Sequence, residues 1–275
     1  MVTGDGKIPH PSPPAGYGYK DMKMKKAIRP FRYKVFGKGQ PVFIIPGLDG
    51  VTEFFADIYP ALSANYQVIK YYLPLLDEAR LTGKKYTYDF IVEDILDVLR
   101  ELGISKAHVI GESFGGSVSL HLALKYPQSI DRLVVLSSAA RFHLSWKVKL
   151  QRVFFPFVPM WLFARVHLHE VCEPVDPPWA KEMFLRNASW ADHKTVVARA
   201  SLAAGHDVTH SVSGIQAPTL LLMGGEDRFT SAGSRELARL LPHCRLAVIA
   251  GSGHLCHMVK PEQFVQEVEK HLGKA

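Results

Sequence analysis

Cysteine is scarce in this sequence of 275 residues, and long hydrophobic runs are absent. The cysteines are Cys172, Cys244 and Cys256. They lie far apart without the spacing of metal ligands, and a sparse, odd set argues against a disulfide framework and fits a reducing compartment. No segment approaches the roughly 18 apolar residues that a membrane-spanning helix requires, and the N-terminus has no apolar stretch of the signal-peptide type. We therefore expect a cytoplasmic protein.

Acidic residues are nearly missing from residues 20–38, which carry eight basic residues and only Asp21 as an acid. This segment accounts for the whole formal net charge of +7. A basic strip can attract anionic lipid or nucleic acid, but no nucleic-acid motif accompanies it. We expect a solvated, charged hairpin at the border of a sheet and no nucleic-acid partner.

The chain does not have the low hydrophobicity that is typical of disordered proteins, since 47% of the residues are hydrophobic and the mean hydropathy is +0.02. The length suffices for one large α/β domain with a modest insertion. Residues 1–30 differ in composition from the rest of the chain, because their first half is rich in proline and glycine. We expect them to form a flexible N-terminal arm.

Short apolar runs alternate with helical patterns along the rest of the chain, which is typical of a parallel sheet covered by helices on both faces. Residues rich in Val, Ile and Leu predict strands that are buried on both faces. The expected strands are residues 32–36, 42–45, 67–72, 107–110, 132–136, 219–223 and 246–249. Helices are expected over residues 88–102, from residue 114 to before Pro127, and from Pro261 to Gly273.

The alternation stops between residues 141 and 213, where no convincing strand occurs and all four tryptophans are found. We interpret this stretch as a helical insertion above the sheet. The predicted organisation is therefore a flexible arm over residues 1–30, an α/β core built from residues 31–140 and 214–275, and a helical cap or lid over residues 141–213.

A serine stands between an expected buried strand and an expected helix, in the sequence Gly111-Glu112-Ser113-Phe114-Gly115. A tight strand-to-helix turn needs glycines on either side, because side chains there would clash with the strand or the helix. Such a turn raises the serine Oγ above the sheet at a helix N-terminus, where the dipole favours negative charge. The pattern favours a nucleophilic serine over a structural serine in a glycine-rich turn.

A serine hydroxyl needs a base to remove its proton, and the base needs an acid to orient it. Asp227 follows the expected strand 219–223, and His254 follows the expected strand 246–249. Both groups therefore emerge at the carboxyl ends of parallel strands, where open α/β sheets place their sites. We expect them to lie close to Ser113.

The order Ser, Asp, His is the one that α/β-hydrolases use, and from about residue 30 the chain resembles the α/β-hydrolase superfamily. The residues around His254 are similar to the family's histidine loop. The resemblance implies an α/β-hydrolase fold, with a mostly parallel central sheet flanked by helices and a helical cap. It also implies that Ser113 is the nucleophile, Asp227 the acid and His254 the base. Glu226 is an alternative acid, and His257 is interpreted as a packing or pocket-rim residue.

The same resemblance implies an oxyanion hole made of two backbone N–H groups. Phe114, directly after the nucleophile, supplies one, and Leu48, in the loop after residues 42–45, supplies the other. In the family a His-Gly pair commonly opens this loop, whereas Pro46 replaces the histidine here. The conformation of the loop is thus left open, and we expect Asp49 to cap the following turn.

A serine nucleophile argues against the dehalogenases and epoxide hydrolases of the superfamily, which use an aspartate. The resemblance implies an esterase- or lipase-like hydrolase of carboxylic esters that forms an acyl-enzyme and needs no metal and no organic cofactor. A carbon–carbon bond hydrolase, a perhydrolase and a non-catalytic relative that binds a ligand or partner stay as alternatives. The oligomeric state stays open.

An apolar stretch over residues 153–163 gives the only indication of the substrate. As the underside of a lid it would favour short- to medium-chain, hydrophobic or aromatic esters and would meet a lipid interface. Ordinary packing of the cap on the core is the other interpretation. The candidate substrate-binding residues are Phe154, Phe155, Phe157, Trp161 and His257.

Overall fold

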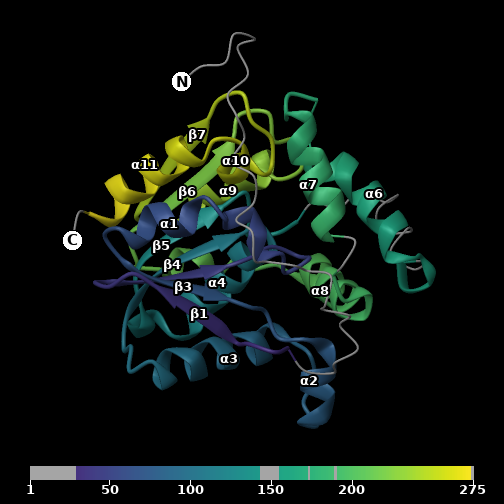
Figure 1. Ribbon diagram of the computed structural model, residues 1–275. Coiled ribbons are helices and arrows are strands. Elements are labelled where there is room, and N and C mark those ends of the chain that lie inside the picture. The colour runs from purple at the N-terminus through teal and green to yellow at the C-terminus, as the bar shows by residue number, and fades with distance from the viewer. Residues whose placement is uncertain (1–28, 143–154, 173, 189–190, 274–275) are drawn as a thin grey trace.

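A seven-stranded sheet forms the centre of the molecule (Figure 1). The computed structural model describes residues 29–142, 155–172, 174–188 and 191–273. The strands follow the order β1-β3-β2-β4-β5-β6-β7, and every neighbouring pair is parallel except β1 and β3. The strands are β1 (Tyr33–Phe36), β2 (Pro41–Ile45), β3 (Gln67–Tyr71), β4 (Ala107–Glu112), β5 (Ile130–Leu136), β6 (Thr219–Gly224) and β7 (Cys244–Ile249).

The structure confirms all seven strands expected from the sequence, each within two residues of its expected limits. Strands β4 and β6 are buried along their whole length. Their sequences are continuous apolar runs because helices cover both faces of the sheet at this point. Strand β1 lies at the edge of the sheet, and its last residues, Val35 and Phe36, are exposed.

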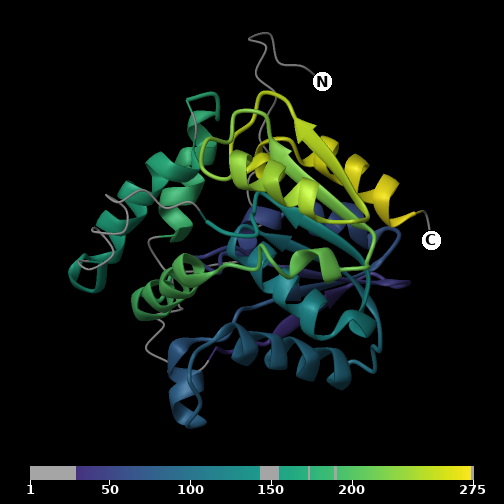
Figure 2. The same cartoon turned by 180° about the vertical axis from the view of Figure 1, so that it is seen from behind.

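Helices cover both faces of the sheet (Figures 1 and 2). On one face pack α1 (Ile58–Ser63), α10 (Cys256–Val259) and α11 (Pro261–Leu272). On the other face pack α3 (Tyr88–Glu101), α4 (Phe114–Lys125) and α9 (Ser231–Leu240). The three helices expected from the sequence correspond to α3, α4 and α11, so the expected helices are confirmed. A short helix, α2 (Leu76–Leu81), follows β3.

Three further helices lie together beside one end of the sheet, namely α6 (Met160–Val171), α7 (Pro178–Ala188) and α8 (His193–Gly205) (Figures 1 and 2). An antiparallel bridge between Arg141 and Asp207 brings the two ends of this segment side by side. The helices fall within residues 141–213, where a cap was expected, and the movement of that segment as a lid stays a prediction. Within the described residues, no helix combines the length and the apolar character needed to cross a bilayer.

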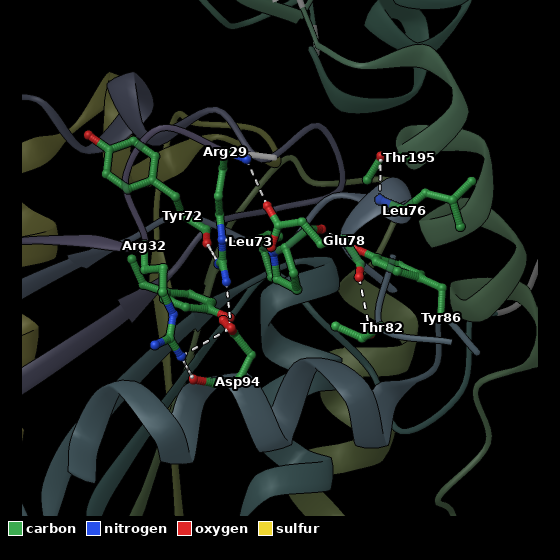
Figure 3. A network of polar contacts seen from close by, with 12 residues as sticks. Arg29, Arg32, Tyr72, Leu73, Leu76, Glu78, Thr82, Tyr86, Asp94 and Thr195 are labelled. Atoms are coloured by element: carbon green, nitrogen blue, oxygen red, sulfur yellow. Dashed lines mark hydrogen bonds and ion pairs between the residues drawn. The ribbon is translucent and has the colours of Figure 1, made fainter. Parts of the chain in front are cut away.

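Arg29, at the start of the described chain, is buried among acidic side chains (Figure 3). Its guanidinium pairs with Glu78 at 3.1 Å and with Asp94 at 2.5 Å, and it donates to the carbonyl oxygen of Tyr72. Arg32 also reaches Asp94, at 3.2 Å. A guanidinium tolerates burial when carboxylates neutralise it. The expectation that residues 20–38 form a solvated basic strip is therefore wrong for Arg29, while residues 1–28 lie outside the described residues.

Candidate active site

Ser113 occupies the sharp turn between β4 and α4, with φ 52° and ψ −112°. A non-glycine residue with positive φ is uncommon and requires support from its surroundings. The N–H of Ser113 donates to the carbonyl oxygen of Leu136 at 2.8 Å, and its carbonyl oxygen accepts from the Ser138 hydroxyl at 2.8 Å. Strand β5 and the residues after it therefore hold the strained turn in place.

The glycines beside Ser113 are required by close backbone contacts. A Cβ on Gly111 would lie 2.3 Å from the carbonyl oxygen of Gly115. A Cβ on Gly115 would lie 2.4 Å from the carbonyl oxygen of Ile45 and 2.5 Å from that of Pro46. The turn thus packs directly against the end of β2 and the start of residues 46–50, which we call the Leu48 loop. These close contacts explain the glycines in the motif.

Gly115→Ala should lower the free energy of unfolding by about 1–3 kcal/mol, because the added methyl group meets backbone atoms that cannot move aside. Urea unfolding followed by circular dichroism measures this change. Gly214→Ala is the matched control, since no atom lies within 4 Å of its Cβ position. Equal stabilities of the two variants would contradict the steric explanation.

Asp227 and His254 form a buried pair at the carboxyl ends of β6 and β7. The Nδ1 of His254 donates to Oδ2 of Asp227 at 3.1 Å, and both residues are 2% exposed. The same carboxylate accepts from the backbone N–H groups of Phe229 and Thr230, at 2.9 and 3.0 Å, and from the Thr230 hydroxyl at 2.5 Å. Glu226, the alternative acid, is exposed, so the structure pairs His254 with Asp227.

The two members of this pair shift each other's proton affinity. Burial alone would raise the pKa of Asp227, but the charge of His254 and hydrogen bonds from His254 and Thr230 outweigh it and lower the pKa to about 2. Burial alone would lower the pKa of His254, but Asp227, with smaller contributions from Glu112 and Asp176, raises it above its ordinary value. Asp227 is therefore an anion, and His254 is a base strengthened by that anion.

Ser137 and Ser138, directly after β5, link the serine turn to the histidine loop. The Ser137 hydroxyl donates to the carbonyl oxygen of His254 at 2.9 Å, and the Ser138 hydroxyl donates to that of Ser113 at 2.8 Å. Ser234 in turn donates to the carbonyl oxygen of Ser138 at 2.7 Å. Sequence reasoning missed these serines, although two small hydroxyl residues after a buried strand, beside the end of β4, were an available signal.

The Leu48 loop lies against the serine turn. Gly50 donates its N–H to the carbonyl oxygen of Gly47 at 3.0 Å, which closes a turn with Leu48 inside it. Asp49 accepts the N–H of Val51 at 3.0 Å, which is a local contact just before the helical turn Thr52–Phe55, so its expected role as the cap of that turn stays a prediction. Phe114, the other expected donor, is buried as the first residue of α4. The assignment of the oxyanion hole to the N–H groups of Leu48 and Phe114 stays a prediction.

Glu112 is a buried carboxyl group that sequence reasoning left without a role. It is 3% exposed, and a Cβ on Gly47 would lie 2.6 Å from its Oε2. Burial, with a contribution from the charge of Asp49, raises the pKa of Glu112 to about 7, although His254 and the N–H of Gly47 favour the ionised form. Glu112 is thus a carboxyl group with a pKa near neutrality that lies against Gly47 and interacts electrostatically with His254.

Glu112→Gln should stabilise the protein more at pH 8 than at pH 5. The folded pKa of about 7 exceeds the ordinary value of 4.5, so the folded state binds more protons between these values and loses stability as the pH rises through them. Glutamine has no charge to bury, and the gain from pH 5 to pH 8 should be about 2–3 kcal/mol. Urea unfolding of both proteins at the two pH values tests this, and an equal difference at both would count against it.

The candidate substrate-binding residues are dispersed by the structure. Phe157 and Trp161 are 83% and 57% exposed, so these two side chains are not packed on the core. Helix α6 instead buries Phe163, which contacts the half-buried Phe155 edge-on at 5.0 Å between ring centroids. Helix α6 thus packs one face inward and exposes the other, and the role of Phe155, Phe157 and Trp161 in substrate binding stays a prediction. Phe154 lies outside the described residues.

His257 is a packing residue and not part of a pocket rim, since it is fully buried. Its ring lies 4.4 Å from that of Phe55 and 5.9 Å from that of Phe264, and burial lowers its pKa to about 3. Phe229 is the aromatic residue that contacts His254, edge-on at 5.4 Å. It was missed because only the fold brings residue 229 against the imidazole.

Comparison with known proteins agrees with this fold. A family model described as "alpha/beta hydrolase fold" matches residues 40–261. The chain is 26% identical to "Putative carbamate hydrolase RutD" of Cronobacter turicensis over 88% of this chain and 92% of the relative. Among solved structures, it resembles the enol-lactonase from Burkholderia xenovorans (TM-score 0.78, 21% identity, 87% and 95% of the chains). It also resembles a thermophilic esterase from Thermogutta terrifontis (TM-score 0.77, 23% identity, 87% and 92%).

Proposed function

The chain belongs to the alpha/beta hydrolase fold family, and from that premise we propose that it is a serine hydrolase of carboxylic esters, with Ser113 as nucleophile. The observation that carries the proposal is the buried Asp227–His254 pair, with its 3.1 Å hydrogen bond. Ser137 and Ser138 attach the histidine loop and the serine turn to the end of the same strand. A serine in a strained strand-to-helix turn and an oriented, strengthened base, both held by residues at the end of β5, are the groups that nucleophilic catalysis needs.

In the proposed mechanism Ser113 Oγ attacks the ester carbonyl carbon while His254 Nε2 takes the hydroxyl proton. The negative charge on the tetrahedral oxygen is stabilised by the N–H groups of Leu48 and Phe114. His254 then donates the proton to the departing alkoxide, which leaves as the alcohol, and an acyl-enzyme remains. Water, deprotonated by His254, releases the acid and restores Ser113.

Carbamates are the second candidate substrate class, favoured by the name of the RutD relatives. The same nucleophile attacks a carbamate carbonyl and forms a carbamoyl-enzyme, so the catalytic residues do not separate the two classes. The acyl group itself is expected to be hydrophobic or aromatic, because Phe229 packs on His254 and lies 6.5 Å from Phe142. An aromatic ring on the base, stacked in turn on a second ring, favours an apolar acyl group over a charged one.

A parallel substrate panel tests this proposal. The protein is assayed with p-nitrophenyl esters from acetate to laurate, with p-nitrophenyl carbamates and with a vinylogous diketone that reports carbon–carbon cleavage. Turnover of the esters is expected, with a maximum at short to medium chain length. Turnover confined to carbamates or to the diketone would replace the ester assignment. Absence of turnover, together with failure of a fluorophosphonate to label Ser113, would favour a binding protein.

A further inference from the structure

Asp176 reaches the histidine loop from the connection between α6 and α7. Its side chain is 3% exposed, and its Oδ1 accepts the N–H of Gly253 at 2.9 Å. Gly253 directly precedes His254, so this bond holds the chain one residue from the imidazole. Proline residues surround Asp176 and restrict the backbone that presents it. These are Pro174, Pro177 and Pro178.

Arg199 reaches the Leu48 loop from helix α8. It is 2% exposed, and its Nη1 donates to the carbonyl oxygen of Leu48 at 3.1 Å. Its Nε donates to the Tyr86 hydroxyl at 3.0 Å, and its Nη2 donates to the carbonyl oxygens of Leu73 and Pro74 at 3.4 and 3.2 Å. One side chain of α8 therefore joins the loop after β2 to the loop after β3.

The Leu48 loop is shaped around this guanidinium. Gly50 has φ +73°, and a Cβ there would lie 2.7 Å from Nη1 of Arg199. The turn is closed by the bond from Gly50 to Gly47, and Arg199 holds the carbonyl group in the middle of it. Both peptide groups that flank Leu48 are thus fixed, including the one whose N–H is the proposed oxyanion donor.

We propose that Asp176 and Arg199 are positioning residues. Asp176 holds the histidine loop, and Arg199 holds the Leu48 loop, in the arrangement that catalysis requires. The proposal rests on the proposed function for the chemistry that it serves. Helices α6 to α8 are then a fixed part of the active site. They complete the catalytic geometry in addition to covering the substrate.

General attachment of these helices to the core is the competing explanation, and it accounts less well for the contacts. An ion is costly to bury unless hydrogen bonds satisfy it, and apolar side chains would attach the helices without that cost. Both buried ions instead bond to the loops that carry Leu48 and His254. Thr195 of α8 also bonds to the rest of the chain, but to neither of these loops. Its Oγ1 accepts the N–H of Leu76, in the segment that enters α2 (Figure 3).

The test compares four variants of the full chain. Asp176→Ala removes the acceptor for Gly253, whereas Asp176→Asn keeps an acceptor and removes only the charge. Arg199→Lys shortens the reach to Leu48, and Thr195→Val is the control that loses another bond between α8 and the core. Tyr86→Phe, which removes only the hydroxyl that holds Arg199, is the second variant if Arg199→Lys does not fold.

Three measurements are made on each variant. The first is kcat and KM on the best p-nitrophenyl ester. The second is hydrogen exchange of peptides that cover residues 46–52 and 250–256. The third is the pKa of His254, measured by NMR on histidine-labelled protein. Exchange and the His254 titration need no turnover, so they decide the positioning role even when the wild type hydrolyses none of the esters and the proposed function fails.

Asp176→Ala and Arg199→Lys should each lower kcat about 10- to 100-fold with KM within about threefold, somewhat less than the loss of an oxyanion donor. Exchange should quicken at 250–256 in the first variant and at 46–52 in the second. Asp176→Asn should retain more kcat than Asp176→Ala and should lower the His254 pKa, since the charges of Asp227 and Glu112 then act without that of Asp176. Thr195→Val should keep kcat within about twofold.

An equal loss of kcat in Thr195→Val would overturn the proposal, because it would show that any loosening of α8 has the same effect. A rise in KM with kcat unchanged would overturn it as well and would leave these residues a role in substrate binding. Unchanged exchange in both catalytic loops would remove the positioning role directly.

Discussion

Ser113→Ala should lower kcat about 10⁴-fold or more, because the alanine methyl group cannot attack a carbonyl and the remaining loops offer only binding and polarisation. The loss should appear in kcat, while KM changes little, since the hydroxyl contributes mainly to the reaction step. Steady-state assays on the best p-nitrophenyl ester measure it. Labelling of the intact protein by a fluorophosphonate should disappear in parallel.

Ser119→Ala is the matched control for this change. Ser119 is buried in α4, the helix that follows Ser113, and its hydroxyl donates within the helix to the carbonyl oxygen of Gly116 at 2.7 Å. Alanine favours the helix, so activity and labelling should stay near the wild-type level. Full activity in Ser113→Ala, or an equal loss in Ser119→Ala, would refute Ser113 as the nucleophile.

Asp227→Asn should lower kcat about 10⁴-fold while leaving the shape of the site intact. Asparagine presents an NH2 group or an uncharged oxygen to His254 Nδ1, so the imidazole loses its orientation and the anion that stabilises its charged form. Because Asp227 raises the pKa of His254, the variant should have a lower His254 pKa. The acid limb of kcat/KM should therefore move to lower pH, on a much smaller plateau, in a pH–rate profile from pH 5 to 9.

Glu226→Gln separates this effect from a general loss of negative charge in the loop. Glu226 adjoins Asp227 in the sequence but is exposed, so its neutralisation should leave both kcat and the acid limb almost unchanged. A larger loss in Glu226→Gln than in Asp227→Asn would identify Glu226 as the orienting acid and overturn the assignment.

The sheet could be predicted from the sequence because its signal is local. Each buried strand is a continuous apolar run, and several of these runs are followed by a helix with its own end signals. For this reason β4, β6 and α11 could be predicted from neighbouring residues alone. Asp227 and His254 could be identified as candidate site residues for the same reason, since each follows such a run. Their meeting at 3.1 Å follows from the parallel order of the strands.

The supporting residues could not be predicted because their signal is not local. Asp176 contacts Gly253 across 77 residues of sequence, and Arg199 contacts Leu48 across 151. Neither side chain stands in a motif, and both look like ordinary surface charges until the helices are packed. The exposure of Phe157 could not be predicted for a related reason, since an apolar stretch does not reveal which of its side chains become buried.

The two bonds from Asp176 and Arg199 also limit how this enzyme can diversify. Helices α6 to α8 are the natural place for a lineage to change its substrate, because they can be exchanged without touching the sheet. A segment transplanted from a relative would change the residues that line the substrate site. It would also leave the histidine loop and the Leu48 loop without their partners, unless it carried an acid and a guanidinium at matching positions. We therefore expect inserted segments and catalytic loops to coevolve, and chimeras that ignore this pairing to fold yet turn over slowly.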